Sequence, residues 1–250
     1  MEKRILSAYA LIITACLSIS CGSKNIQHER KNFTLEQFQS QYEVQQANYI
    51  QNLRVISDDD SSVEILRYAL NCKSTLSCQT ALKKIYSLNL KIYKKEIKDI
   101  INKKDGVTRY LAFKVFSQDS IESDDLNLVV NYLNDREWLV REICVRQMRK
   151  YSTEKKEKKY FTKLLLMLNE KNPDVVKELY RTLKWYDESE AFKFLFQRSF
   201  HASTEIEQVF ILRELAEYKK PIVKNRLNNI SRYNKSFIVR QEAKELVNQW

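Results

Sequence analysis

From residue 33 onward, apolar side chains recur three and four positions apart, the spacing that gathers them on one face of an α-helix. Clusters of Asn, Asp, Ser and Pro interrupt this pattern about once per helix length. The pattern therefore predicts an all-α chain. The expected helices cover residues 34–55, 61–71, 79–101, 106–117, 122–134, 136–150, 155–169, 173–185, 188–200, 204–217, 220–231 and 235–248.

The second helix of each expected pair carries a stripe of three positions spaced four residues apart. The stripes begin at Val107, Val140, Val175, Glu207 and Val239, in steps of 33, 35, 32 and 32 residues. All these positions are apolar or small except Glu207, and so constant a step is a repeat period. A single helical hairpin cannot bury its own apolar face, so we expect neighbouring hairpins to stack into a solenoid with one continuous core.

Two segments, 135–144 and 234–243, share the pattern Val-Arg-x-x-small residue. In this they resemble HEAT repeats, including the short HEAT-like class. The resemblance is clearest over residues 105–250 and weaker over 33–100. It implies a helical superhelix with a polar ladder between repeats, built from an Asp and an Arg six positions apart. Asp135 and Arg141 fit that ladder, whereas Asn234 replaces the acid before Arg240.

The N-terminus has the order of an export signal: two cations within residues 1–4, an apolar run over 5–19, and then Cys21. The run is shorter than the ~20 residues of a permanent membrane span. It resembles a bacterial lipoprotein signal peptide, which implies an acylated cysteine. We expect that cysteine to be Cys21, because a polar stretch follows it; Cys16 is the alternative, because the residues before it fit the usual box better.

This interpretation divides the chain into four parts. Residues 1–20 are the signal peptide and 21–32 a flexible tether. Residues 33–104 form an N-terminal helical region, and 105–250 form the HEAT-like repeats. The location that follows is the bacterial cell envelope, with the protein attached to a membrane by its lipid.

Composition excludes several function classes. The chain has 2 Gly, 2 Pro and 2 His, too few turn residues for a sheet protein and too few glycines for a phosphate-binding loop. His28 and His201 offer little material for a metal site or a nucleophile triad. We therefore expect no catalytic residue, no metal and no cofactor.

The cysteines of the folded part suggest one cross-link. Cys72 and Cys78 flank a short polar segment between two expected helices. Because the signal places the chain in an oxidising compartment, we expect them to form a disulfide, with two free thiols as the alternative. Cys144 lies on an apolar helical face and is expected to be a core residue.

The chain is basic, with a net charge of +11, and residues 135–250 hold 25 Lys and Arg against 17 Asp and Glu, or +8. Cations on the second helices could line a groove, or they could be ordinary solvated and ladder residues. Trp185 adds an aromatic of the kind that dominates binding hot spots. The candidate partner-binding residues are Arg141, Lys177, Arg181, Lys184, Trp185, Arg213 and Lys244.

Together these observations predict a lipid-anchored envelope protein that acts as a non-catalytic scaffold or adaptor and binds an unidentified protein or peptide. The alternative is a basic nucleic-acid-binding protein resembling HEAT-like DNA glycosylases. An export signal argues against that alternative, because it removes the chain from the genome. Nucleic acid is therefore the less favoured partner.

Overall fold

The computed structural model describes residues 34–54, 61–104, 106–118, 123–152 and 158–250. The expected signal peptide, the tether, Cys16 and Cys21 lie outside these ranges. Among the helices that the structure describes, none combines the length and apolar character needed to cross a bilayer.

Regular structure in the described ranges is entirely helical. The fourteen helices of these ranges are α2 (Leu35–Gln39), α3 (Glu43–Asn52), α4 (Ser61–Asn71), α5 (Thr75–Leu88), α6 (Lys94–Lys103), α7 (Gly106–Phe116), α8 (Ser123–Asn131), α9 (Trp138–Ser152), α10 (Lys158–Leu165), α11 (Pro173–Tyr186), α12 (Glu188–Arg198), α13 (Glu205–Ala216), α14 (Pro221–Tyr233) and α15 (Phe237–Asn248).

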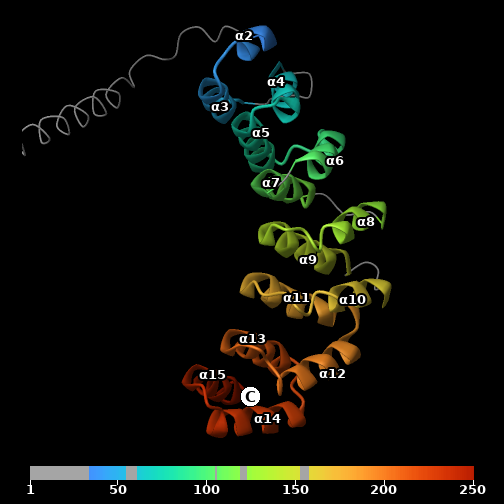
Figure 1. The fold of residues 1–250 in the computed structure, drawn as a ribbon, viewed down its shortest axis with the longest axis vertical. Coiled ribbons are helices and arrows are strands. Elements are labelled where there is room, and N and C mark those ends of the chain that lie inside the picture. Colours follow the sequence, from blue (N-terminus) through green and yellow to red (C-terminus); the bar gives the residue numbers. More distant parts are fainter. Residues whose placement is uncertain (1–33, 55–60, 105, 119–122, 153–157) are drawn as a thin grey trace, which may run out of the picture.

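From α3 onward the helices stand in two rows that run the length of a bent molecule (Figure 1). The inner row lies on the concave side and consists of α3, α5, α7, α9, α11, α13 and α15, each packed on the next. The outer row consists of α4, α6, α8, α10, α12 and α14, which pack mainly on inner-row helices. This arrangement is the predicted all-α helical-repeat solenoid.

Equivalent positions of the inner-row helices form a continuous core. Val140, Cys144 and Met148 of α9 are fully buried, as are Val175 and Leu183 of α11. Because each hairpin leaves one face for its neighbour, burial of the repeated apolar stripe holds the stack together. The core placement expected for Cys144 is confirmed.

Two expected helices are each divided in the structure. The segment 34–55 contains α2 and α3, and the segment 79–101 contains most of α5 and most of α6. In the second case Asn89 ends α5 with φ of 53°, in the left-handed region that Asn tolerates better than most residues. The apolar pattern continues past this turn, which is why it suggested one long helix.

The stripe expected in α7, at Val107, Leu111 and Val115, is buried only at Val115. Val107 is exposed, and Leu111 is only half-buried. Thr108, Ala112 and Phe116 are buried in their place. The correct register was hidden because Thr108 is polar; its hydroxyl accepts a hydrogen bond from Gln79 Nε2 of α5 at 3.0 Å.

The expected disulfide is absent from the structure, where Cys72 and Cys78 are free thiols. Cys78 lies inside α5 and not in the link before it, and its Sγ faces the Leu70 carbonyl oxygen at 3.6 Å. Cys72 Sγ instead faces the Ala69 carbonyl oxygen at 3.2 Å. Burial raises the pKa of the Cys78 thiol to about 11.

Candidate binding surfaces along the inner row

Arg141, the first candidate binding residue, joins two repeats. Its Nε and Nη2 contact the Glu170 carboxylate, which precedes α11, at 2.5 and 2.9 Å. Its Nη1 donates to the Asp135 carbonyl oxygen at 2.8 Å. Burial opposes ionisation of Glu170, but hydrogen bonds from Arg141 and from the backbone amides of residues 171 and 172 lower its pKa. Arg141 is thus held in a bidentate inter-repeat pair.

The ladder implied by the HEAT resemblance is present, but its partners differ from those expected. Arg141 donates a hydrogen bond to the backbone carbonyl oxygen of Asp135 and not to its carboxylate. That carboxylate pairs with Arg109 of α7, in the preceding repeat. It also accepts the Glu137 amide through Oδ1 at 2.8 Å. The α9 repeat is therefore linked to both neighbours, to α7 through the turn before α9 and to the turn before α11 through Arg141.

Glu207, which broke the apolar stripe in the sequence, is buried at the junction of α11, α12 and α13. Its carboxylate accepts Tyr180 Oη at 2.5 Å, Arg198 Nε at 2.8 Å and the Ser203 amide at 2.6 Å. Burial would raise its pKa, but these donors lower it. Glu207 is a structural acid with its hydrogen-bonding capacity used inside the protein.

Arg181 and Lys184, two more candidates, belong to a network of ion pairs that crosses the inner row. Arg181 contacts Glu178 of its own helix and Glu214 of α13, and Lys184 Nζ lies 2.7 Å from Glu214 Oε2. Lys184 also pairs with Glu217. Burial disfavours the charged amine, but the two carboxylates raise the pKa of Lys184. These cations are matched by acids of neighbouring helices.

The other candidate cations lie apart from that network. Arg213 of α13 makes a bidentate pair with Glu242 of α15, at 2.8 and 2.7 Å. Lys177 is half-buried on α11, and Lys244 is exposed on α15. The structure therefore brings together Arg181, Lys184 and the adjacent Trp185, but it does not gather all seven candidates into one groove.

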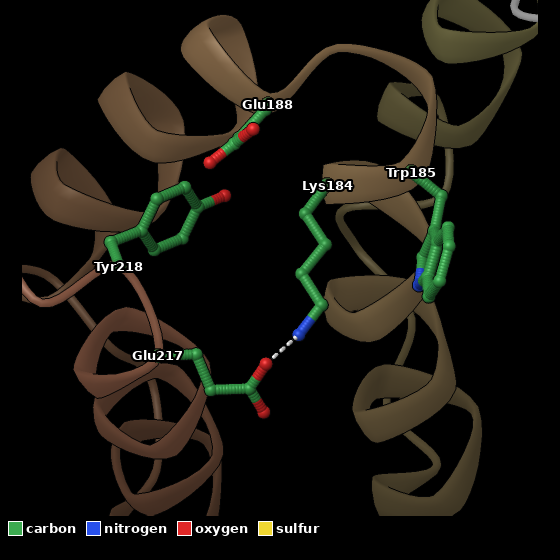
Figure 2. Close-up of a pocket in the computed structure, with 5 residues that line it drawn as sticks. All are labelled: Lys184, Trp185, Glu188, Glu217 and Tyr218. Carbon is green, nitrogen blue, oxygen red and sulfur yellow. Dashed lines mark hydrogen bonds and ion pairs between the residues drawn. The ribbon is translucent and has the colours of Figure 1, made fainter.

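Trp185 lies between two cavities at the C-terminal end of α11. The first, of about 280 Å³, is lined by Lys184, Trp185, Glu188, Glu217 and Tyr218. Figure 2 shows Lys184 reaching toward Glu217, with the Tyr218 hydroxyl turned toward the same space. That hydroxyl is buried and has no hydrogen-bond partner among the described residues. Burial and the nearby carboxylate of Glu188 raise the pKa of Tyr218, which keeps it a neutral donor.

The second cavity, of about 430 Å³, lies between the ends of α9 and α11. It is lined by Ser117, Arg146, Gln147, Arg149, Lys150 and Trp185. The side-chain oxygen of Gln147 is buried there without a hydrogen-bond partner in the described part of the chain. A buried polar atom without a partner costs stability. We call the two cavities and the indole between them the Trp185 cleft.

Sequence reasoning identified Trp185 and Lys184 but missed the rest of the cleft. Tyr218 and Gln147 carry no motif, and only the stacking of α9, α11 and α13 brings them beside Trp185. The pairing acids Glu178 and Glu214 could have been found, because they lie on the same repeated helices as the basic residues. A count of the basic residues alone does not show that these acids pair with them.

The described residues contain no group of three or more His, Cys, Asp or Glu side chains that could hold a metal ion. His201 is exposed in the turn after α12.

Comparison with known proteins gives little further information. No family model matches the chain, and no curated protein matches it. Among solved structures, it is similar to a designed armadillo repeat protein, YIII(Dq)4CqI, with 13% sequence identity and a TM-score of 0.45. The match covers 73% of this chain and 97% of that chain. The fold assignment therefore rests on this protein's own helices and their contacts.

Proposed function

We propose that this protein is a non-catalytic scaffold that binds a protein or peptide partner at the Trp185 cleft. The supporting observation is the cleft itself: an indole that is 42% exposed, flanked by two cavities, each lined by a residue whose buried polar atom has no hydrogen-bond partner among the described residues. Trp, Tyr and Arg side chains around a recess are the usual composition of a binding hot spot. The cleft offers donors and acceptors for a polypeptide.

The pairing of charges supports a protein partner over nucleic acid. A nucleic-acid groove requires cations that are available to phosphates. On the inner row, Arg181, Lys184 and Arg213 instead contact carboxylates of adjacent helices. The net charge of +11 is therefore less available on the concave side than the sequence suggests.

We further propose that the chain is attached to a membrane of the bacterial envelope by a lipid on Cys21, with Cys16 as the alternative. This part rests on the sequence of residues 1–32. Labelling with a fatty-acid precursor in a bacterial host tests it, in the parent and in Cys21→Ser and Cys16→Ser variants. Loss of label only in Cys21→Ser supports the proposal; an unlabelled parent in the soluble fraction contradicts it.

Affinity capture from detergent-solubilised envelopes tests the binding role. The parent, Trp185→Ala and the outer-row control Lys163→Ala are used as baits. The proposal expects a protein that is retained by the parent and the control and is depleted by about tenfold or more with Trp185→Ala. Equal retention by all three baits would show that the cleft is not the binding site.

A further inference from the structure

The second residue of the inner-row helices forms a repeated pattern of its own. In six of the seven inner-row helices described, this residue is aliphatic. We call this set the aliphatic stripe: Val44, Leu76, Val107, Leu139, Ile206 and Ile238.

These side chains are not part of the core. Leu139 is half-buried, and the other five are between 43% and 63% exposed. Asp174 interrupts the stripe in α11, but Leu166, in the turn before that helix, is 69% exposed beside it. Single exposed aliphatic residues are common on protein surfaces. The same exposed position in successive repeats, maintained at a period of about 32 residues, is not explained by packing within the repeats.

The members of the stripe lie along one edge of the solenoid, because the first turns of successive inner-row helices are in contact. Gln79 of α5 bonds to Thr108 of α7. Arg141 of α9 bonds to Glu170 before α11, and Gln208 of α13 accepts from Asn234 before α15 at 3.3 Å. We call this edge the N-terminal rim. It is the opposite edge from the Trp185 cleft, which lies at the C-terminal ends of the same helices.

A second stripe runs beside the first. For five of the inner-row helices, the residue three positions before the second residue of the helix is Lys or Arg, and it lies in the preceding turn. We call this set the basic stripe: Lys73, Lys104, Arg136, Lys171 and Lys235. All are exposed except Lys104, which is half-buried. Four of the seven inner-row helices described, α5, α7, α9 and α15, thus present both a positive and an aliphatic position at the N-terminal rim.

The rim is hollowed between repeats. One cavity of about 400 Å³ is lined by residues that include Leu133, Leu166 and Arg141, and a second of about 630 Å³ by residues that include Val176, Ile206 and Phe210. Asn169, Glu170 and Lys171 line both cavities, so the two form one groove on either side of a basic-stripe residue. Volumes of this size accommodate large side chains of a ligand.

The spacing indicates the form of the occupant. Packed helices lie about 8–10 Å apart, and an extended chain advances about 3.3 Å per residue. An extended peptide that crosses the rim therefore passes one repeat with about every third residue. We propose that the N-terminal rim binds an extended acidic peptide that has an aliphatic residue at every third position, its carboxylates paired with the basic stripe.

The recessed geometry favours a peptide over an anionic membrane. Membrane-inserting residues must project from the surface, whereas Ile206 of the stripe and Leu166 line the cavities of the groove. This inference does not depend on the Trp185 cleft, because the two surfaces lie on opposite edges.

Fluorescence anisotropy with a labelled synthetic peptide tests the inference on the full-length chain in detergent. The probe consists of six Leu-Glu-Ser triplets, roughly the length that six steps of about 10 Å require. A peptide of the same composition with its leucines in one block is the control for spacing. We expect the triplet peptide to bind at least about tenfold more tightly than the blocked peptide.

Two triple charge-reversal variants distinguish binding by the rim from attraction by the overall positive charge of the protein. Lys73→Glu, Lys171→Glu and Lys235→Glu alter the basic stripe, while Lys95→Glu, Lys163→Glu and Lys224→Glu make the same charge change on exposed outer-row residues. We expect about tenfold weaker binding only in the first triple, and a similar loss in Leu76→Ser with Ile206→Ser and Ile238→Ser. Circular dichroism establishes that each variant is folded.

Equal losses in the two charge triples would overturn the inference, as would equal binding of the two peptides. Binding of anionic vesicles, and not of the peptide, that depends on the basic stripe would assign the rim to a membrane. Trp185→Ala is expected to retain the triplet peptide. Loss of binding in that variant would place the peptide in the Trp185 cleft and refute the rim.

Discussion

At the residue scale, Glu207 shows how a polar residue can be part of a repeat core. From the sequence it was an interruption of an apolar stripe. In the structure it accepts the Tyr180 hydroxyl, which lies one repeat earlier, and Arg198 of the intervening helix. The partners are separated by 27 and 9 residues, so only the stacking of repeats brings them together.

Glu207→Ala is expected to destabilise the protein by about 2–4 kcal/mol, because the buried Tyr180 hydroxyl and Arg198 guanidinium lose their shared acceptor. Urea unfolding measures the change, with Glu205→Ala as an exposed control on the same turn. Since the pKa of Glu207 is lowered in the folded state, its contribution is complete above the unfolded-state pKa and is lost as the pH falls through the folded one. A pH-independent difference between parent and variant would contradict this account.

The cysteines provide a second test at this scale. In a variant carrying Cys16→Ser and Cys21→Ser, alkylation after unfolding in urea should add three adducts, one each at Cys72, Cys78 and Cys144, because all three are free thiols. Without denaturant, Cys78 and Cys144 should react much more slowly than Cys72, since both are buried. A single adduct in the unfolded protein, read by mass spectrometry, would show that Cys72 and Cys78 are joined after all.

At the element scale, helix existence was easier to predict than helix ends. The spacing of apolar residues indicated nearly every helical segment, but it did not mark the turn between α5 and α6. That turn depends on the left-handed conformation of Asn89, with its amide bonded to the Tyr86 carbonyl oxygen at 3.2 Å. Asn is tolerated in a helix and in such a cap, so the sequence alone did not distinguish the two.

Asn89→Val is therefore expected to lower the free energy of unfolding by about 1–2 kcal/mol, because a β-branched residue is strained at positive φ. Asn89→Gly, which adopts this conformation without strain, should be at least as stable as the parent. Thermal unfolding compares the three proteins. If the valine variant is as stable as the glycine variant, α5 and α6 form one continuous helix, as the sequence suggested.

At the scale of the whole molecule, the repeat period predicted the solenoid but not its surfaces. A period of about 32 residues determines that hairpins stack, and the buried positions of α9, α11 and α13 agree with it. The charge balance was less informative, because it did not show that Glu178 and Glu214 lie between Arg149, Arg181 and Lys184. The Trp185 cleft was predictable only as far as its tryptophan and the adjacent lysine.

The pairing of Glu178 and Glu214 with basic residues is expected to limit the binding of nucleic acid. The double variant Glu178→Gln with Glu214→Gln removes two carboxylates and leaves their cations available to phosphates. We expect it to bind a short DNA duplex several-fold more tightly than the parent and with a steeper dependence on salt. Filter binding over a range of salt concentrations measures both quantities. Tight, salt-dependent binding by the parent itself would favour the nucleic-acid function.

The central claim is that a partner occupies the Trp185 cleft in the cell envelope. Replacing Glu188, an exposed residue that lines the first cavity of the cleft, with a photoreactive phenylalanine analogue, and Lys163 with the same analogue as an outer-row control, tests it directly in living cells and leaves Trp185 in place. The account predicts a discrete cross-linked product at position 188, identifiable by mass spectrometry, and none at position 163. Products at both positions, or at neither, would contradict it.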